Sequence, residues 1–296
     1  MTWVNAIIQG MLQGGIYALI ACGLSLAFGV MRVVNLAHGD LAVCGAYLAL
    51  VFSTALGVPV WYTLPLVLPA AFAAGMVLQL LLLRRALRGG AFATVLVTFG
   101  LSVMIENLLQ VGATANDRVL NTGAIGVASV RIGSQITLPW LFVAAFLTAC
   151  GVLTVLQLLL SMTSWGRKVR AIADDVDTAR LVGVRVGPVF ATVAGFAVAT
   201  AALAGIFIGA IGNFNPLTGT STLIFAFEAV VIGGLGSLWG TLAGGIALGV
   251  TQVVVGEINE AYAVLAVHLL FLLVLAVRPA GLFPTGQPAR AAQVIG

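Results

Sequence analysis

The sequence is a succession of long apolar segments separated by short polar connections. A helix that crosses about 30 Å of hydrocarbon needs about 20 largely apolar residues, and segments of this kind recur along the whole chain. The seventh and eighth are short and meet in a glycine-rich turn, so they form either two spans or one re-entrant pair, and the total is eight or nine. The predicted spans are residues 4–30, 33–54, 58–83, 92–111, 138–161, 189–212, 218–235, 239–256 and 260–277.

The composition indicates the same class of protein. Of the 296 residues, 61% are apolar and only 7% are charged, whereas a soluble domain carries about 25% charged residues. So few charges cannot cover the surface of a soluble protein of this size. This excludes a soluble enzyme, a disordered chain and a nucleic-acid-binding domain, and it predicts an all-α, polytopic membrane helical bundle.

The positions of the basic residues predict the orientation in the membrane. They cluster in two connections and the C-terminal tail, and an even number of spans separates these groups, so all can lie on one face. The positive-inside rule makes that face cytoplasmic, which puts the C-terminus in the cytoplasm. Arg118 and Arg131 are exceptions, since both fall in the 112–137 connection. The basic residues of the expected inner face are Arg32, Arg84, Arg85, Arg88, Arg167, Lys168, Arg170, Arg180, Arg185, Arg278 and Arg290.

No motif indicates a metal site, a cofactor or catalysis by this chain. Cys22, Cys44 and Cys150 stand singly in apolar segments, without the spacing of a metal site or a disulfide framework. The phosphate-binding G-x-x-x-x-G-K-[ST] loop is absent, and the single lysine, Lys168, lies in no such loop. We therefore expect a transporter rather than an enzyme, driven by an ion gradient or by a separate ATPase.

Residues 166–183 have the periodicity of an amphipathic helix. Apolar residues recur at three- and four-residue steps and form one stripe, and charged residues occupy the other faces. Such a helix lies on the cytoplasmic surface, where its stripe either enters a groove on a partner or packs on its own bundle or in the headgroup region. Gly166 and Gly183 are expected to break the helix at its two ends. The predicted docking residues are Gly166, Arg167, Arg170, Ala171, Ile172, Ala173, Asp174, Asp175, Ala179, Leu181 and Gly183.

Three further motifs accompany this segment: GGIYAL at 14–19 with GLSLAFG at 23–29, VNLAHGD at 34–40, and AVVIGGLGS at 229–237 with WG at 239–240. Together they resemble the bacterial ABC-transporter permeases for branched-chain amino acids, specifically the shorter, H-type subunit. The resemblance covers essentially the whole chain.

The resemblance implies one permease domain over residues 1–296 in the inner membrane, with an ATPase-docking loop at 162–188. It also implies the partners of a heteromeric importer. These are a second homologous permease subunit, two cytoplasmic ATP-binding subunits and an extracytoplasmic solute-binding protein, in a lipid environment. Transport is then expected to proceed by alternating access, in which the ATPases push the docking helix.

Two polar clusters in apolar surroundings are the candidates for the substrate pathway or gate. Asn35, His38 and Asp40 are expected to share one helical face, with Gly39 permitting a break. The alternative is a structural polar knot in which His38 pairs with Asp40. Glu228 precedes the hinge of Gly233, Gly234 and Gly236, and an acid within an apolar helix suggests contact with an ammonium group or with an arginine of another subunit.

Two other functions stay open at the level of sequence. Within the family, the substrate could be urea, a short amide or a sugar, because no residue decides between them. In another class, Glu106, Glu228 and Asp40 could serve a proton-coupled secondary transporter. A purely structural membrane protein fits poorly with breaks and polar residues at membrane depth.

Overall fold

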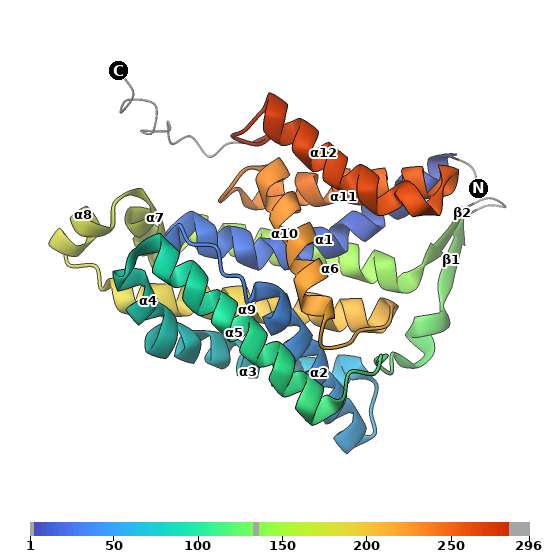
Figure 1. Ribbon diagram of the computed structural model, residues 1–296, viewed down its shortest axis with the longest axis horizontal. Helices are drawn as coiled ribbons and strands as arrows, with labels where there is room; N and C mark the ends of the chain where they lie inside the picture. Colours follow the sequence, from blue (N-terminus) through green and yellow to red (C-terminus); the bar gives the residue numbers. More distant parts are fainter. Residues whose placement is uncertain (1–2, 133–135, 284–296) are drawn as a thin grey trace.

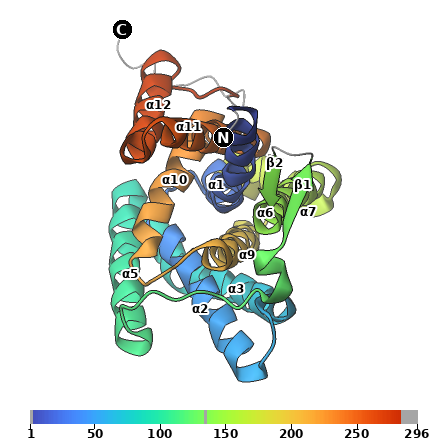
Figure 2. The ribbon, with the colours of Figure 1, turned by 90° about the vertical axis from the view of Figure 1, so that its right-hand side faces the viewer.

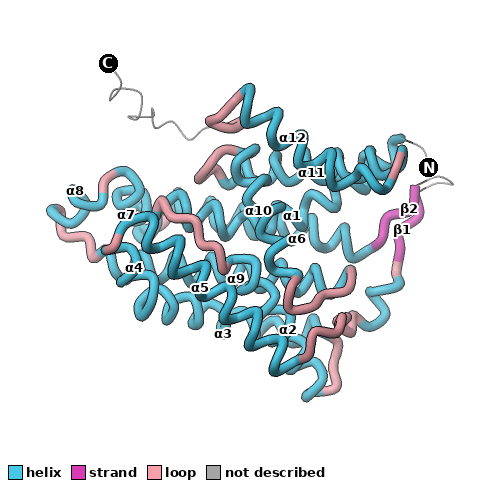
Figure 3. Tube along the Cα trace, in the orientation of Figure 1, coloured by secondary structure: helices cyan, strands magenta, loops and turns pink. Residues whose placement is uncertain are grey.

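The computed structural model describes residues 3–132 and 136–283, and helices make up most of it (Figures 1 and 3). Within these residues, 8 helices are long and apolar enough to cross a membrane, which confirms the predicted helical membrane bundle. The helices are α1 (Trp3–Met31), α2 (His38–Leu56), α3 (Leu64–Leu78), α4 (Arg84–Arg88), α5 (Gly90–Ala113), α6 (Trp140–Met162), α7 (Ser164–Asp174), α8 (Val176–Leu181), α9 (Val186–Ile211), α10 (Thr218–Gly233), α11 (Leu238–Ile258) and α12 (Ala263–Val277).

Most predicted spans agree with these helices to within a few residues. The third span is composite, because η1 (Val60–Thr63), α3, the π-helical turn η2 (Gln79–Leu83) and α4 follow one another without a gap. The connection after α5 contains structure that was not predicted. It holds a 3-10 turn, η3 (Gly123–Val127), and a hairpin of β1 (Ser129–Ile132) and β2 (Ile136–Pro139), antiparallel with Ser129 opposite Pro139. A further 3-10 turn, η4 (Glu260–Tyr262), leads into α12.

The bundle has two distinct ends (Figure 1). α4, α7 and α8 lie at one end, and the β1–β2 hairpin and the N-terminus lie at the other; we call them the α7 end and the hairpin end. The two arginine-rich connections predicted to share a face therefore do so. Arg118 lies in the connection that leads toward the hairpin, and Arg290 lies outside the described residues.

Helices α1 and α9 occupy the middle of the bundle, and the other helices surround them (Figure 2). α1 packs along α11 with very close backbones. A Cβ added to Gly14 would come within 2.5 Å of the Cα of Ile246, and one added to Gly249 would overlap the carbonyl of Gly10. Lipid provides no hydrophobic drive for helix association, so close van der Waals packing between small residues is a main source of stability here.

Helix α2 begins well inside the bundle and not at its end. α1 ends at Met31, and residues 32–37 return toward the middle without helical structure. The ring Nε2 of His38 then lies 3.0 Å from the carbonyl oxygen of Ile20. Ile20 precedes the end of α1 by eleven residues, which corresponds to about 16 Å of helix. The predicted span 33–54 is thus wrong at its start, because its first five residues are not helical.

Helix α10 is also short, with 16 residues, and a non-helical segment precedes it. In that segment, the Asn215 side chain donates to Asp117 Oδ1 at 2.8 Å, in the connection after α5. At the other end of α10, Gly236 packs against Gly29, close to the end of α1. α10 begins inside the bundle, so residues 212–217 and α10 together make one crossing, and α11 makes the next one as a full-length helix. The two are therefore not a re-entrant pair.

The α1–α11 contact predicts a position-specific effect on stability. Gly249→Ala should lower the free energy of unfolding by about 1–3 kcal/mol, since it overpacks a backbone contact. Gly151→Ala in α6 is the matched control, because open space surrounds that position and alanine is the better helix former. Thermal unfolding of the two purified variants in detergent measures this, and equal melting temperatures would contradict the packing described.

Candidate pathway and docking sites

The N-termini of α2 and α10 meet inside the bundle. A Cβ on Gly39 would overlap the carbonyl oxygen of Gly219, and a Cβ on Gly219 would overlap the carboxylate of Asp40. Both positions therefore require glycine. The amino end of a helix carries a partial positive charge, so two such ends lie beside the Asp40 side chain.

Asp40 is only 2% exposed at this junction. Its Oδ2 accepts a hydrogen bond from the Ser102 hydroxyl of α5, and its Oδ1 has no hydrogen-bond partner among the described residues. A buried carboxylate oxygen without a partner is rare and calls for an explanation. The junction of α2, α5 and α10 is thus the strongest candidate for a polar contact in the pathway, and Ser102 and Gly219 were not predicted to belong to it.

Asn35 and His38 do not share a helical face with Asp40, which corrects the prediction. Asn35 lies in the non-helical segment before α2. Its Oδ1 accepts from the Ala37 N–H at 3.1 Å, and its carbonyl accepts from the His38 N–H at 3.1 Å. His38 bonds to Ile20 and not to Asp40, so the His38–Asp40 pair of the alternative interpretation is also wrong. Both residues hold the turn that starts α2.

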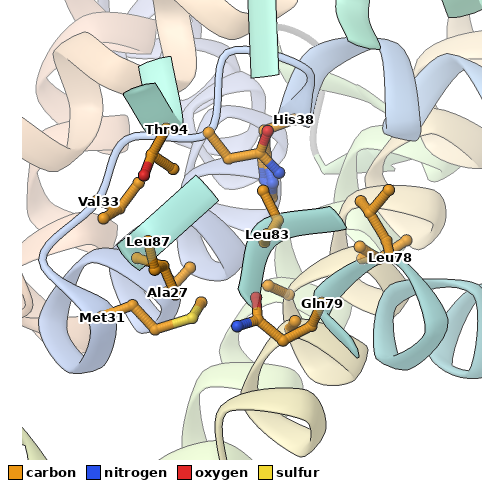
Figure 4. Close-up of a pocket in the computed structure, with 13 residues that line it drawn as sticks. Ala27, Met31, Val33, His38, Leu78, Gln79, Leu83, Leu87 and Thr94 are labelled. Carbon is orange, nitrogen blue, oxygen red and sulfur yellow. The ribbon is translucent and has the colours of Figure 1, made fainter. Parts of the chain in front are cut away.

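A narrow, mostly apolar pocket lies behind this turn. Figure 4 shows His38 and Gln79 among the side chains that line it, together with Met31, Leu83 and Thr94. The Oε1 of Gln79 is buried and has no partner among the described residues. Gln79 opens the π-helical turn η2, a deviation that often accompanies functional sites. It was missed because one glutamine in an apolar segment gives no pattern.

Glu228 is 4% exposed in α10 and is paired. His268 of α12 lies with Nδ1 at 2.6 Å from Glu228 Oε1. The His268 ring stacks on Phe225, which in turn stacks on Tyr17 of α1, with centroids 5.9 Å and 5.0 Å apart. This pair joins α10 to α12. Sequence reasoning missed it, because forty residues separate its members.

The glycine-rich turn after α10 has the conformation that its sequence requires. Gly234 and Gly236 have φ of 104° and 83°, which favour glycine. A Cβ on Gly233 would overlap the Gly240 backbone. The Ser237 side chain caps α11 by accepting from the Gly240 N–H at 3.1 Å. The chain beyond α12 covers the turn, since Leu282 N–H donates to the Ile232 carbonyl at 2.8 Å. That this turn is a hinge stays a prediction.

The predicted amphipathic helix at 166–183 is two helices, α7 and α8. Asp175 separates them, with φ −152° and ψ 115°, and caps α8 by accepting from the N–H groups of Asp177 and Thr178 at 2.8 and 3.0 Å. Gly166 does not break the helix, because it lies in the first turn of α7, packed on Leu160. Gly183, with φ 84°, does end α8.

The apolar stripe of this loop packs mainly on the protein itself. Val169, Ile172 and Ala179 are buried in a cluster with residues of α1, α6 and α9. This agrees with the structural alternative and shows that these residues are not free to enter a partner. Leu181 and Val182 at the end of α8 are 88% and 73% exposed. Of the predicted docking residues, those exposed are Arg167, Arg170, Asp174, Asp175, Leu181 and Gly183, and those partly or fully covered are Gly166, Ala171, Ile172, Ala173 and Ala179.

Long apolar helices that surround buried carboxylates define an integral membrane protein. The chain belongs to the family of branched-chain amino acid transport system permease components, whose sequence model matches residues 6–277.

Named relatives match over nearly the full length. The chain is 28% identical to the high-affinity branched-chain amino acid transport system permease protein BraD of Pseudomonas aeruginosa, over 97% of this chain and 96% of BraD. It is 27% identical to LivH of Salmonella typhimurium, with the same coverage. It is also 27% identical to LivM of that organism, over 92% of this chain and 69% of LivM. No solved structure matches the chain.

Because Glu228 and His268 contact each other, we expect substitutions at the two positions to have non-additive effects on stability. His268→Ala should lower the free energy of unfolding by about 1–3 kcal/mol, because a buried carboxyl loses its donor. Glu228→Leu combined with His268→Ala should cost less than the sum of the two single changes. A double-mutant cycle by thermal unfolding in detergent measures the difference, and additivity within about 0.5 kcal/mol would show that the pair does not interact.

Proposed function

We propose that this chain is one permease subunit of an ABC importer that carries branched-chain amino acids across the inner membrane. The likeness to BraD and LivH over 97% of the chain carries the proposal. The proposed assembly contains a second permease of the same family, two ATP-binding subunits and an extracytoplasmic solute-binding protein. The similarity to LivM supports the second permease, since it shows that the family holds chains of more than one length.

The α7 end faces the cytoplasm in this proposal. Ten basic residues lie in its connections or directly after α12, namely Arg32, Arg84, Arg85, Arg88, Arg167, Lys168, Arg170, Arg180, Arg185 and Arg278, as the positive-inside rule requires of a cytoplasmic face. The C-terminus then lies in the cytoplasm, because α12 runs from the hairpin end to the α7 end (Figure 1). The ATPases would dock on α8, where the exposed Leu181 and Val182 offer an apolar tip.

A direct contact joins the docking loop to the interrupted crossing. The Arg32 guanidinium donates to the Ala173 carbonyl oxygen in α7 at 3.0 Å. Arg32 is also the first residue of the non-helical segment that leads to His38 and Asp40, and its φ of 53° is unusual for a residue other than glycine. A displacement of α7 by the ATPases would therefore pull on the start of α2.

The pathway in this proposal passes the junction of α2 and α10. Asp40 would contact the ammonium group of the passing solute, because its Oδ1 has no partner among the described residues and is buried where α2 and α10 begin. Gly39 would allow the two N-termini to separate, and Gly233, Gly234 and Gly236 would let α10 turn. Glu228 would keep α10 attached to α12 during the movement, through His268. Asn35 and His38 would position the segment rather than touch the solute.

Charge at the tip of α8 should disrupt coupling to the ATPases. We expect Leu181→Asp with Val182→Asp to reduce ATP-dependent uptake at least about tenfold, since it places charge in an apolar contact. Val127→Asp is the control, because Val127 is 91% exposed in η3 on the connection to the hairpin. Uptake of labelled leucine into vesicles that hold the complete assembly measures this. Transport by this chain alone, driven by an imposed proton gradient, would contradict the proposed function.

Loss of the hydrogen bond from Arg32 to the Ala173 carbonyl should uncouple ATP hydrolysis from transport. Arg32→Gln should keep ATP hydrolysis near the level of the unchanged assembly and lower the amount of solute moved per ATP several-fold. Arg85→Gln, at an exposed position of α4 outside the docking loop, should change neither quantity. Parallel assays of phosphate release and uptake test this, and an unchanged ratio in Arg32→Gln would remove Arg32 from the coupling route.

A further inference from the structure

An open groove at the α7 end contains about 1240 Å³ of empty space between α4 and the start of α9. Four arginines from three parts of the chain line it. Arg84 and Arg88 belong to α4, Arg180 to α8, and Arg185 directly precedes α9. No described residue in the lining is acidic. The groove is therefore strongly cationic, although residues far apart in the sequence form it.

Three of the four guanidinium groups lack a counter-charge from the protein. Arg180 donates to Asp177 at 2.9 Å. The side chains of Arg84, Arg88 and Arg185 make no hydrogen bond or ion pair with any residue in 3–132 or 136–283. Like charges that share a groove repel one another, so this arrangement favours an anion from outside the chain.

The other lining residues show which kind of anion fits. Met31, Leu87, Val186 and Phe190 give the groove an apolar floor. On the same side of the bundle, Leu80 and Leu81, one turn before α4, are largely exposed, as expected of side chains that face lipid. Arg84 and Arg88 end the apolar stretch Val60–Arg88, and Arg185 stands just before the apolar α9. The guanidinium groups thus lie where hydrocarbon gives way to headgroups.

We propose that this groove binds the headgroup of an anionic phospholipid. Arginine presents planar pairs of donors that match phosphate oxygens, so Arg84, Arg88 and Arg185 would hold the phosphate while the acyl chains follow the apolar floor. A basic pocket between membrane helices at the cytoplasmic surface suits such headgroups. A bound lipid would bridge α4 to the start of α9, close to α8, and would stabilise the α7 end. This inference does not depend on which solute the protein carries.

The test compares lipid binding in two variants of equal charge. One replaces Arg84, Arg88 and Arg185 by Gln, and the control replaces Arg85, Arg167 and Lys168, which lie at the same end outside the groove lining. Each purified chain is titrated in detergent with cardiolipin, phosphatidylglycerol or phosphatidylcholine. Thermal stability is recorded together with native mass spectrometry.

We expect the unchanged chain and the control variant to be stabilised by the two anionic lipids and not by phosphatidylcholine. The groove variant should bind the anionic lipids roughly 100-fold more weakly, at about 1 kcal/mol for each arginine lost. Three results would overturn the inference. They are equal lipid binding by the two variants, equal stabilisation by inorganic phosphate or glycerol phosphate, and loss of ATPase binding in the groove variant while its lipid binding is retained. The last would assign the groove to the ATPase interface.

Discussion

A peptide group in hydrocarbon has no water to bond, and this constraint decides where the chain can leave the helical conformation. Irregular backbone at membrane depth is tolerated only inside protein or beside a cavity. The interrupted segments agree with this rule, because local side chains bond their backbone. Asn35 accepts from Ala37, Asn215 accepts from Leu217 at 2.9 Å, and Ser237 accepts from Gly240. Each interruption is therefore held in place by specific hydrogen bonds.

Two of these interruptions bring the amino ends of α2 and α10 together beside Asp40. A helix end at depth provides exposed donors and a partial positive charge without an added charged residue. Such an end can approach another only where side chains are absent, and Gly39 and Gly219 meet this condition. The same close approach recurs along α1 and α11, so glycine both holds the bundle together and makes room for its polar junction.

The sequence alone predicted where most of the long helices lie, but not which side chains contact one another between helices. Apolar length predicted the long spans, since the membrane fixes a minimum number of residues. It could not predict that α2 starts at His38, because residues 33–37 are as apolar as a span. Periodicity predicted the amphipathic loop as a single helix. It did not reveal the break at Asp175, which caps a second helix. The polar partners, Ser102 for Asp40 and His268 for Glu228, depend on which helices become neighbours, and a single sequence does not contain that pattern.

The proposed mechanism requires that the amino ends of α2 and α10 move when the ATPases close. Hydrogen–deuterium exchange measures this directly, in the assembled transporter with and without a non-hydrolysable ATP analogue. The account predicts that the amides of residues 33–41 and 216–221 change their exchange rates together with those of α7, while the middle of α9 stays protected in both states. A change confined to α7 and α8, with the two amino ends unaltered, would contradict it.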